Sequence, residues 1–135
     1  MKQRITLIAL LTAFLFVFTP NADARSATET NWAKGHWDRW PAKVEKTARC
    51  ISKHESWNAG LWTARNRHST ASGFAQWLDP IWRQQARRAH VGTQYARAYL
   101  APPRIQAAVF AYQAQHYGIG PWSPQIFPCP SARIR

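Results

Sequence analysis

A single carboxyl group, that of Glu55, is the first candidate for chemistry in this chain. It lies in the stretch Cys50-Ile-Ser-Lys-His-Glu-Ser-Trp-Asn58, and it is the only acidic residue between Lys46 and Leu78. A positioned carboxyl group can donate a proton and later accept one if its pKa suits the working pH. A lone carboxyl group at a helix end, followed by tryptophan and asparagine, indicates chemistry on sugars.

A helix is expected to carry Glu55 at its C-terminal end. Pro41 suits the first turn of this helix, and the residues that follow share one face at steps of three and four. The apolar members of that face are Val44, Ala48 and Ile51. Because Glu55 continues the stripe, partial burial should disfavour its charged form and raise its pKa. The competing interpretation is a surface glutamate paired with Lys53 or a nearby arginine.

The remaining pattern predicts further helices. Asp79-Pro80 is typical of an N-cap followed by an N1 proline and predicts a helix to about His90. Two more helices are predicted over residues 93–100 and 105–116, the second ending before Gly118. The predicted face of the last helix consists of Ile105, Val109, Tyr112 and His116, with Ala108 and Ala111 beside it.

Two segments lack a helical period. Residues 58–75 are rich in Gly, Ser, Thr, Asn and Arg, which predicts a loop or short hairpin. Residues 25–39 are polar and contain tryptophan, and they are interpreted as a polar leader or a partly ordered arm. Ordered structure is therefore expected to start near Trp40, with one domain over residues 40–135.

The N-terminus has the pattern of a secretory signal peptide. Lys2 and Arg4 precede an apolar run over residues 5–18, and Ala22-Asp23-Ala24 places small residues where a signal peptidase reads them. The run is shorter than the roughly 20 residues that span a bilayer, so an uncleaved anchor is the weaker alternative. Residues 1–24 are predicted to be removed, giving a secreted or cell-wall protein without stable membrane insertion.

The chain is strongly basic, with a formal net charge of +12 at pH 7. Such a field attracts polyanions, which outside a cell include anionic wall polymers and membrane surfaces. Nucleic acid is not expected as a partner of an exported chain, and a monomer is expected. The alternative is that the scattered basic residues only form a solvated surface.

The two cysteines, Cys50 and Cys129, are an even pair in a chain predicted to be exported. An oxidising compartment favours one disulfide between them. Closing a loop of that size stabilises a fold by about 4 to 5 kcal/mol in the chain-entropy model. The bond would tie the C-terminal tail to the helix that carries Glu55.

Other catalytic chemistries find little support. The five histidines lack metal-ligand spacing and no glycine-rich phosphate loop occurs, so no metal and no cofactor are expected. His54 points about 100 degrees away from Glu55 on a helix and is interpreted as structural. No serine lies in a Gly-x-Ser-x-Gly setting, and the cysteines are expected to be consumed by the disulfide.

Four short segments form a wider pattern that includes Glu55. They are Glu55-Ser56, Gly73-Phe74-Ala75-Gln76, residues 106–112, and Gly118-Ile-Gly-Pro-Trp122. Together they resemble the lysozyme-like domain of lytic transglycosylases and resuscitation-promoting factors, over about residues 42–124. The resemblance implies a small, mainly α, lysozyme-like α+β domain in which residues 58–75 form one wall of a glycan cleft. It implies a secreted enzyme that cleaves the β-1,4 bond between MurNAc and GlcNAc in peptidoglycan.

The resemblance also implies site residues. Glu55 matches the catalytic glutamate, and Gln76 matches a glutamine that lies in the cleft near the sugar. Tyr112 stands roughly where the family has a Tyr-Asn pair, although Gln113 replaces the asparagine and the glycine is delayed to Gly118.

Three tryptophans are candidate sugar-binding residues. Trp77 and Trp122 lie beside matched segments, and their flat indole faces could stack on sugar rings or could simply fill the core. Trp57 stands where the family often has glycines, so it could line the cleft or occupy it.

A second catalytic carboxyl group is hard to find, although glycoside hydrolysis normally uses two. Asp38 and Glu45 precede or begin the Glu55 helix, and Asp79 is expected to be a helix cap. In lytic transglycosylases the 6-hydroxyl of muramic acid attacks the anomeric carbon, so one carboxyl group is enough. The resemblance thus favours this reaction, with hydrolysis through Asp79 or a water held by Gln76 as the alternative.

Two classes of protein other than an enzyme stay open. One is a non-catalytic, lysozyme-like module that binds wall glycan. The other is a cationic antibacterial surface protein that acts by charge alone.

Overall fold

The computed structural model describes residues 22–122 and 128–134, the side chains of 22–26 excepted. Most of the predicted signal peptide lies outside these residues. Its last three residues, from Ala22, form the start of the first helix. Among the residues described, no helix is both long enough and apolar enough to cross a membrane.

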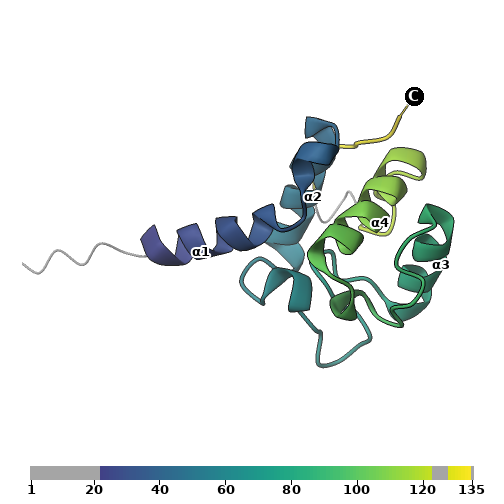
Figure 1. Cartoon of the computed structure of the whole chain (residues 1–135), viewed down its shortest axis with the longest axis horizontal. Helices are drawn as coiled ribbons and strands as arrows, with labels where there is room; N and C mark the ends of the chain where they lie inside the picture. The colour runs from purple at the N-terminus through teal and green to yellow at the C-terminus, as the bar shows by residue number, and fades with distance from the viewer. Residues whose placement is uncertain (1–21, 123–127, 135) are drawn as a thin grey trace, which may run out of the picture.

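The described chain is mainly helical, as the sequence predicted (Figure 1). The long helices are α1 (Ala22–Ala33), α2 (Ala42–Glu55), α3 (Asp79–Ala89) and α4 (Pro103–His116). Short 3-10 helices occupy Trp37–Arg39, Leu61–Thr63 and Ala98–Leu100. Across the described ranges, extended pairing is limited to two isolated antiparallel bridges, Arg65–Ser72 and Ser72–Trp77.

Helix α2 matches its prediction in both position and face. Val44, Ala48 and Ile51 are fully buried, and the helix ends at Glu55. Pro41 precedes the first turn, and its carbonyl oxygen accepts a hydrogen bond from the Val44 backbone N–H. The apolar stripe therefore anchors α2 in the core and presents Glu55 at the end of that buried face.

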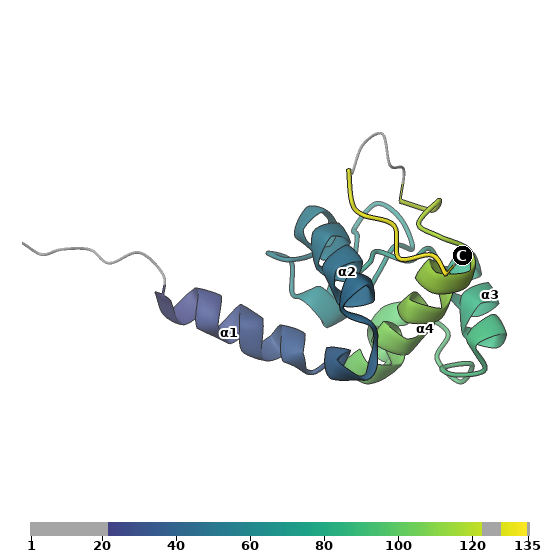
Figure 2. The same cartoon turned by 90° about the horizontal axis from the view of Figure 1, so that it is seen from above.

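The prediction that ordered structure starts near Trp40 is wrong. Residues 22–33 form α1, and Trp32 is 1% exposed in a cluster with Trp37, Trp62 and Phe74. The N-terminal end of α1 projects away from the other helices in both views, whereas its other end joins the body (Figures 1 and 2). Among the side chains of α1 that the structure describes, only Trp32 is buried, and the polar residues around it give the segment the composition of an exposed leader.

Helix α4 packs between α2 and α3 (Figures 1 and 2). Its buried face differs from the predicted one, because Gln106, Phe110 and Gln113 are buried with Val109, whereas His116 is exposed. Alanines lie on several sides of this helix, so apolarity alone does not define its inner face. The side-chain amides of Gln106 and Gln113 donate hydrogen bonds to carbonyl oxygens of neighbouring segments. These bonds determine which face of α4 is turned inward.

The helix predicted over residues 93–100 is also wrong, apart from the 3-10 turn at Ala98–Leu100. The backbone turns at Gly92, which has a φ of 73°, and the Tyr95 carbonyl oxygen accepts a hydrogen bond from the Trp82 indole N–H. The Trp82 side chain of α3 therefore occupies the Tyr95 carbonyl oxygen. In a helix over residues 93–100, that oxygen would accept a backbone hydrogen bond.

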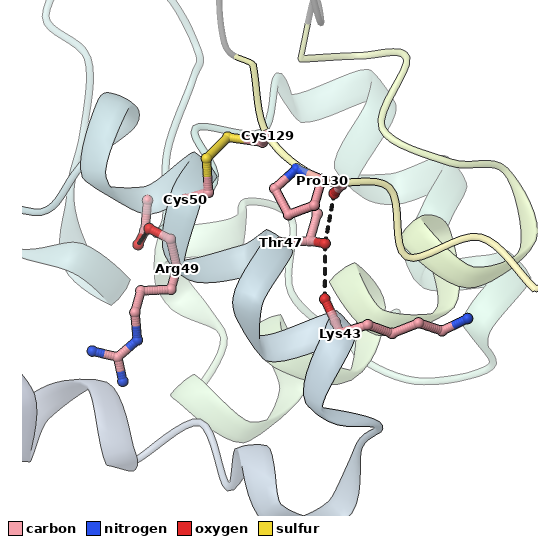
Figure 3. The surroundings of a disulfide bond; sticks show 7 residues. Lys43, Thr47, Arg49, Cys50, Cys129 and Pro130 are labelled. Carbon is pink, nitrogen blue, oxygen red and sulfur yellow. Dashed lines mark hydrogen bonds between the residues drawn. A yellow bond between two sulfur atoms is a disulfide. The ribbon is translucent and has the colours of Figure 1, made fainter.

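The predicted disulfide between Cys50 and Cys129 is confirmed, with Cα atoms 5.6 Å apart (Figure 3). Next to it, the Thr47 hydroxyl group contacts the Pro130 and Lys43 carbonyl oxygens at 2.7 and 2.8 Å. The tail is thus fixed along α2 on the side away from the Arg49 guanidinium. Disulfides are typical of proteins outside the cytoplasm.

Candidate functional site

Glu55 occupies the last position of α2 with its side chain half-buried. Burial raises the pKa of its carboxyl group, and the nearby charge of His54 opposes this shift to a smaller extent. The Glu55 carboxyl group makes no hydrogen bond or ion pair with another described residue. It is therefore a partly desolvated carboxyl group, which is the state that a general acid needs.

Ser56 connects the end of α2 to the segment Gly73-Phe74-Ala75-Gln76. Its side chain is buried, and its hydroxyl group donates a short hydrogen bond to the Phe74 carbonyl oxygen. This bond joins two of the segments that carry the resemblance, although 18 positions separate them. The loop is thereby fixed next to the residue that follows Glu55.

The segment Gly73–Gln76 is the turn of a minimal hairpin. Ser72 and Trp77 exchange two backbone hydrogen bonds, of 3.0 and 2.8 Å, so four residues form the loop between them. Gln76 adopts a left-handed backbone with a φ of 50°, and its side-chain amide donates to the Gly73 carbonyl oxygen at 3.0 Å. The Gln76 side chain is thus held against its own loop.

Gln106 of α4, which was not predicted as a functional residue, organises this loop. Its side-chain oxygen accepts a hydrogen bond from the Phe74 N–H at 3.1 Å, and its amide group donates to the Trp62 and Ala101 carbonyl oxygens at 2.8 and 2.9 Å. Trp122 adds a bond from its indole N–H to the Ala75 carbonyl oxygen at 2.7 Å. All four segments that carry the resemblance therefore meet at residues 73–76.

The predicted sugar-binding aromatics are divided by their exposure. Trp77 and Trp122 are only 2% and 5% exposed and pack edge to face, so their indole faces belong to the core. Both rings therefore fill the core, which is the alternative that the sequence left open for them, and neither presents a face on which a sugar ring could stack. Tyr112 is half-buried beside His116 and Tyr117, on the face of α4 that is turned away from the core.

Trp57 directly follows the Glu55-Ser56 pair and is half-buried. Its ring lies 5.6 Å from that of Trp32, with the Arg49 guanidinium and the Lys53 ammonium group 5.7 and 5.8 Å from its centre. It therefore packs toward α1 and leaves part of its surface to solvent.

Three of the other described acids are occupied in ion pairs with arginines. Glu29 and Glu45 both pair with Arg49, at 2.7 and 3.1 Å. Asp79 was predicted to cap α3, but no side-chain cap is formed there, and its buried carboxylate lies 3.2 Å from the Arg97 Nε. The backbone N–H of Asp79 instead donates to the Thr70 hydroxyl group.

One group of potential metal ligands occurs among the described residues: Cys50, His54 and Cys129, whose ligand atoms lie within 4.8 Å of one another. Both sulfur atoms are shared in the disulfide. Because thiolates rather than disulfide sulfurs bind metals, this group is not a metal site in the oxidised protein.

Two surface cavities meet at Tyr99 and leave Glu55 outside. One, of about 620 Å³, is lined by residues that include Trp62, Leu100 and Pro102. The other, of about 380 Å³, is polar and arginine-rich. No protein-family model, curated protein or solved structure matches this chain.

Proposed function

We propose that this chain is a secreted, lysozyme-like peptidoglycan-cleaving enzyme that acts on the MurNAc–GlcNAc β-1,4 bond as a single-glutamate lytic transglycosylase. The observation that carries the proposal is the half-buried Glu55, with no described ion-pair partner, beside a loop that Ser56 and Gln106 fix in place. The two isolated bridges over residues 65–77 would be the small β part of the lysozyme-like fold.

In the proposed reaction, Glu55 first donates its proton to the glycosidic oxygen as the C–O bond breaks. The 6-hydroxyl of the same muramic acid then attacks the anomeric carbon, and the Glu55 carboxylate accepts the hydroxyl proton. The products are a 1,6-anhydro ring and a free hydroxyl on the leaving sugar, without consumption of water. The pairing of Glu29, Glu45 and Asp79 with arginines supports a mechanism with one carboxyl group.

The second candidate function is a wall-binding module without catalysis. Burial of Trp77 and Trp122 favours it, because these rings cannot stack on a sugar at an active site. The position of Glu55 outside the two cavities that meet at Tyr99 favours it as well.

Release of soluble muropeptides from purified peptidoglycan separates the two functions. Glu55→Gln keeps the side-chain shape and removes the titrating proton, so the rate should fall by about 10²- to 10⁴-fold. Asp38→Asn is the matched control, because Asp38 is an exposed acid in the 3-10 helix before α2, and it should release muropeptides at the unaltered rate. Binding to peptidoglycan without release by the unaltered protein would instead support the binding module.

A further inference from the structure

The polar cavity of about 380 Å³ beside the hairpin 72–77 has the composition of an anion-binding site. Its lining includes three arginines and no acidic residue. The lining residues used in this argument are Arg65, Arg67, Arg97, Ser69, Thr70 and Tyr99. A guanidinium group carries a permanent charge and a planar set of donors that match phosphate and carboxylate oxygens.

Two of the arginines are held in place by described partners. The Arg65 guanidinium carbon lies 5.0 Å from the centre of the Tyr99 ring, a cation–π contact that does not use its N–H groups. Arg97 directs its Nε at the buried Asp79 carboxylate, 3.2 Å away. Within the part of the chain that the structure describes, the terminal N–H groups of both side chains have no hydrogen-bond partner, so they can bind a ligand.

Two hydroxyl groups complete the donor set. The Ser69 hydroxyl oxygen accepts a hydrogen bond from the Ala71 N–H, and the Thr70 hydroxyl oxygen accepts one from the Asp79 N–H, each at 3.2 Å. Because both oxygens act as acceptors in these bonds, their hydrogens can be donated to another group.

We propose that this cavity binds a phosphate group, either as free inorganic phosphate or as the phosphodiester of an anionic polymer. Three guanidinium groups around one cavity suit the charge and the several oxygens of a phosphate group. The site is separate from Glu55, so binding does not depend on the proposed cleavage of glycan. The cavity would account for part of the affinity for polyanions that the net charge of +12 implies.

The test is an NMR titration of the oxidised protein with inorganic phosphate at constant ionic strength, which follows the arginine side-chain N–H signals. Arg65→Gln combined with Arg67→Gln removes two of the donors and keeps the Arg97–Asp79 pair intact. The matched control is Arg83→Gln with Arg87→Gln, since both are exposed on α3 and the charge lost is the same.

We expect the Kd for phosphate to rise by about tenfold or more in the cavity variant, as for lost hydrogen bonds between charged groups. It should change by less than about twofold in the control. Equal weakening in both variants would overturn the proposal, because it would show attraction to diffuse charge. Unchanged binding in the cavity variant would overturn it as well.

The source of the phosphate group is determined by a second titration with poly(glycerol phosphate). If the polymer shifts the signals of the cavity arginines and inorganic phosphate displaces it, the cavity binds a polymer phosphodiester. If the polymer leaves those signals unchanged while inorganic phosphate moves them, the cavity is a site for the free ion. A failure of Glu55-dependent cleavage would alter neither result.

Discussion

At the scale of single residues, the burial of Glu55 has opposite effects on stability and on catalysis. Burial raises the pKa of this carboxyl group. A raised pKa keeps more of the acid protonated near neutral pH, which a proton donor requires. It also means that the charged form is less stable in the folded protein than in the unfolded chain.

The raised pKa determines how the effect of Glu55 on folding stability depends on pH. Below the unfolded-state pKa of about 4.3, Glu55 is protonated in both states and burial carries no charge penalty. As the pH rises through the higher folded-state pKa, the free-energy cost of burying the charged carboxylate increases to its full value. The Glu55→Gln protein should therefore be slightly more stable than the unaltered protein at neutral pH and equal to it at about pH 3. Urea unfolding at both pH values checks this, and a less stable variant at neutral pH would contradict it.

Gly73 is the second residue with a testable role. Its φ is 74°, and a Cβ atom there would lie 2.4 Å from the Gln106 side-chain oxygen and 3.0 Å from the Ala98 Cβ. Gly73→Ala should lower the free energy of unfolding by about 1 to 3 kcal/mol, because it strains the backbone and displaces the amide that holds the loop.

Gly120→Ala is the control for this substitution, since no described atom beyond its two chain neighbours lies within 4 Å of the Cβ position. Its effect should stay within about 0.5 kcal/mol. Equal unfolding midpoints for the two alanine variants in urea would show that the turn at residues 73–76 does not need glycine.

Some of these residues could be predicted from sequence and others could not. The position of Glu55 at the end of a buried face was predictable, because the apolar stripe of its helix is a local sequence pattern. The role of Gln106 was not predictable, because its hydrogen-bond partners Phe74 and Trp62 lie 32 and 44 positions away in the sequence. Nothing in the sequence of α4 distinguishes this buried glutamine from an exposed one.

At the scale of elements, α1 shows how composition can mislead. Glu29, Thr30 and Asn31 give the segment a polar character, yet the neighbouring Trp32 is buried and donates its indole N–H to the Glu45 carboxylate at 3.0 Å. Arg49 of α2 adds an ion pair to Glu29 on α1 and lies over the Trp32 ring. One aromatic and one arginine therefore hold α1 to α2.

Trp32→Ala should consequently lower the free energy of unfolding by about 3 to 5 kcal/mol, the usual cost of emptying a buried tryptophan site. Thr30→Ala is the control on the same helix, because Thr30 is exposed. Chemical unfolding measures both. A loss below about 0.5 kcal/mol for Trp32→Ala would restore the interpretation of this segment as a leader.

At the scale of the whole molecule, the disulfide closes a loop with a sequence separation of 79. It joins α2 to the tail, where the Lys43 ammonium group also donates to the Arg133 carbonyl oxygen at 3.2 Å. The sequence predicted this bond from two cysteines and a predicted signal peptide. The disulfide was expected to tie the tail to this helix, but the hydrogen bonds of the tail to Thr47 and Lys43 were not predictable, since residues 128–134 show no regular pattern.

Replacing both Cys50 and Cys129 by serine should lower the free energy of unfolding by about 4 to 5 kcal/mol, since the unfolded chain regains the entropy of an open loop. Urea unfolding of the double variant beside the oxidised protein gives this difference. Equal unfolding midpoints would show that the crosslink does not stabilise the fold.

We propose that Glu55 cleaves peptidoglycan with the substrate's own hydroxyl as the nucleophile. The first test is mass spectrometry of the muropeptides that the oxidised protein releases, beside those from Glu55→Gln. Products ending in 1,6-anhydromuramic acid are expected, and they should be absent with the variant. Products one water heavier would contradict the transglycosylase mechanism, and release that does not depend on Glu55 would contradict the assignment of the catalytic residue.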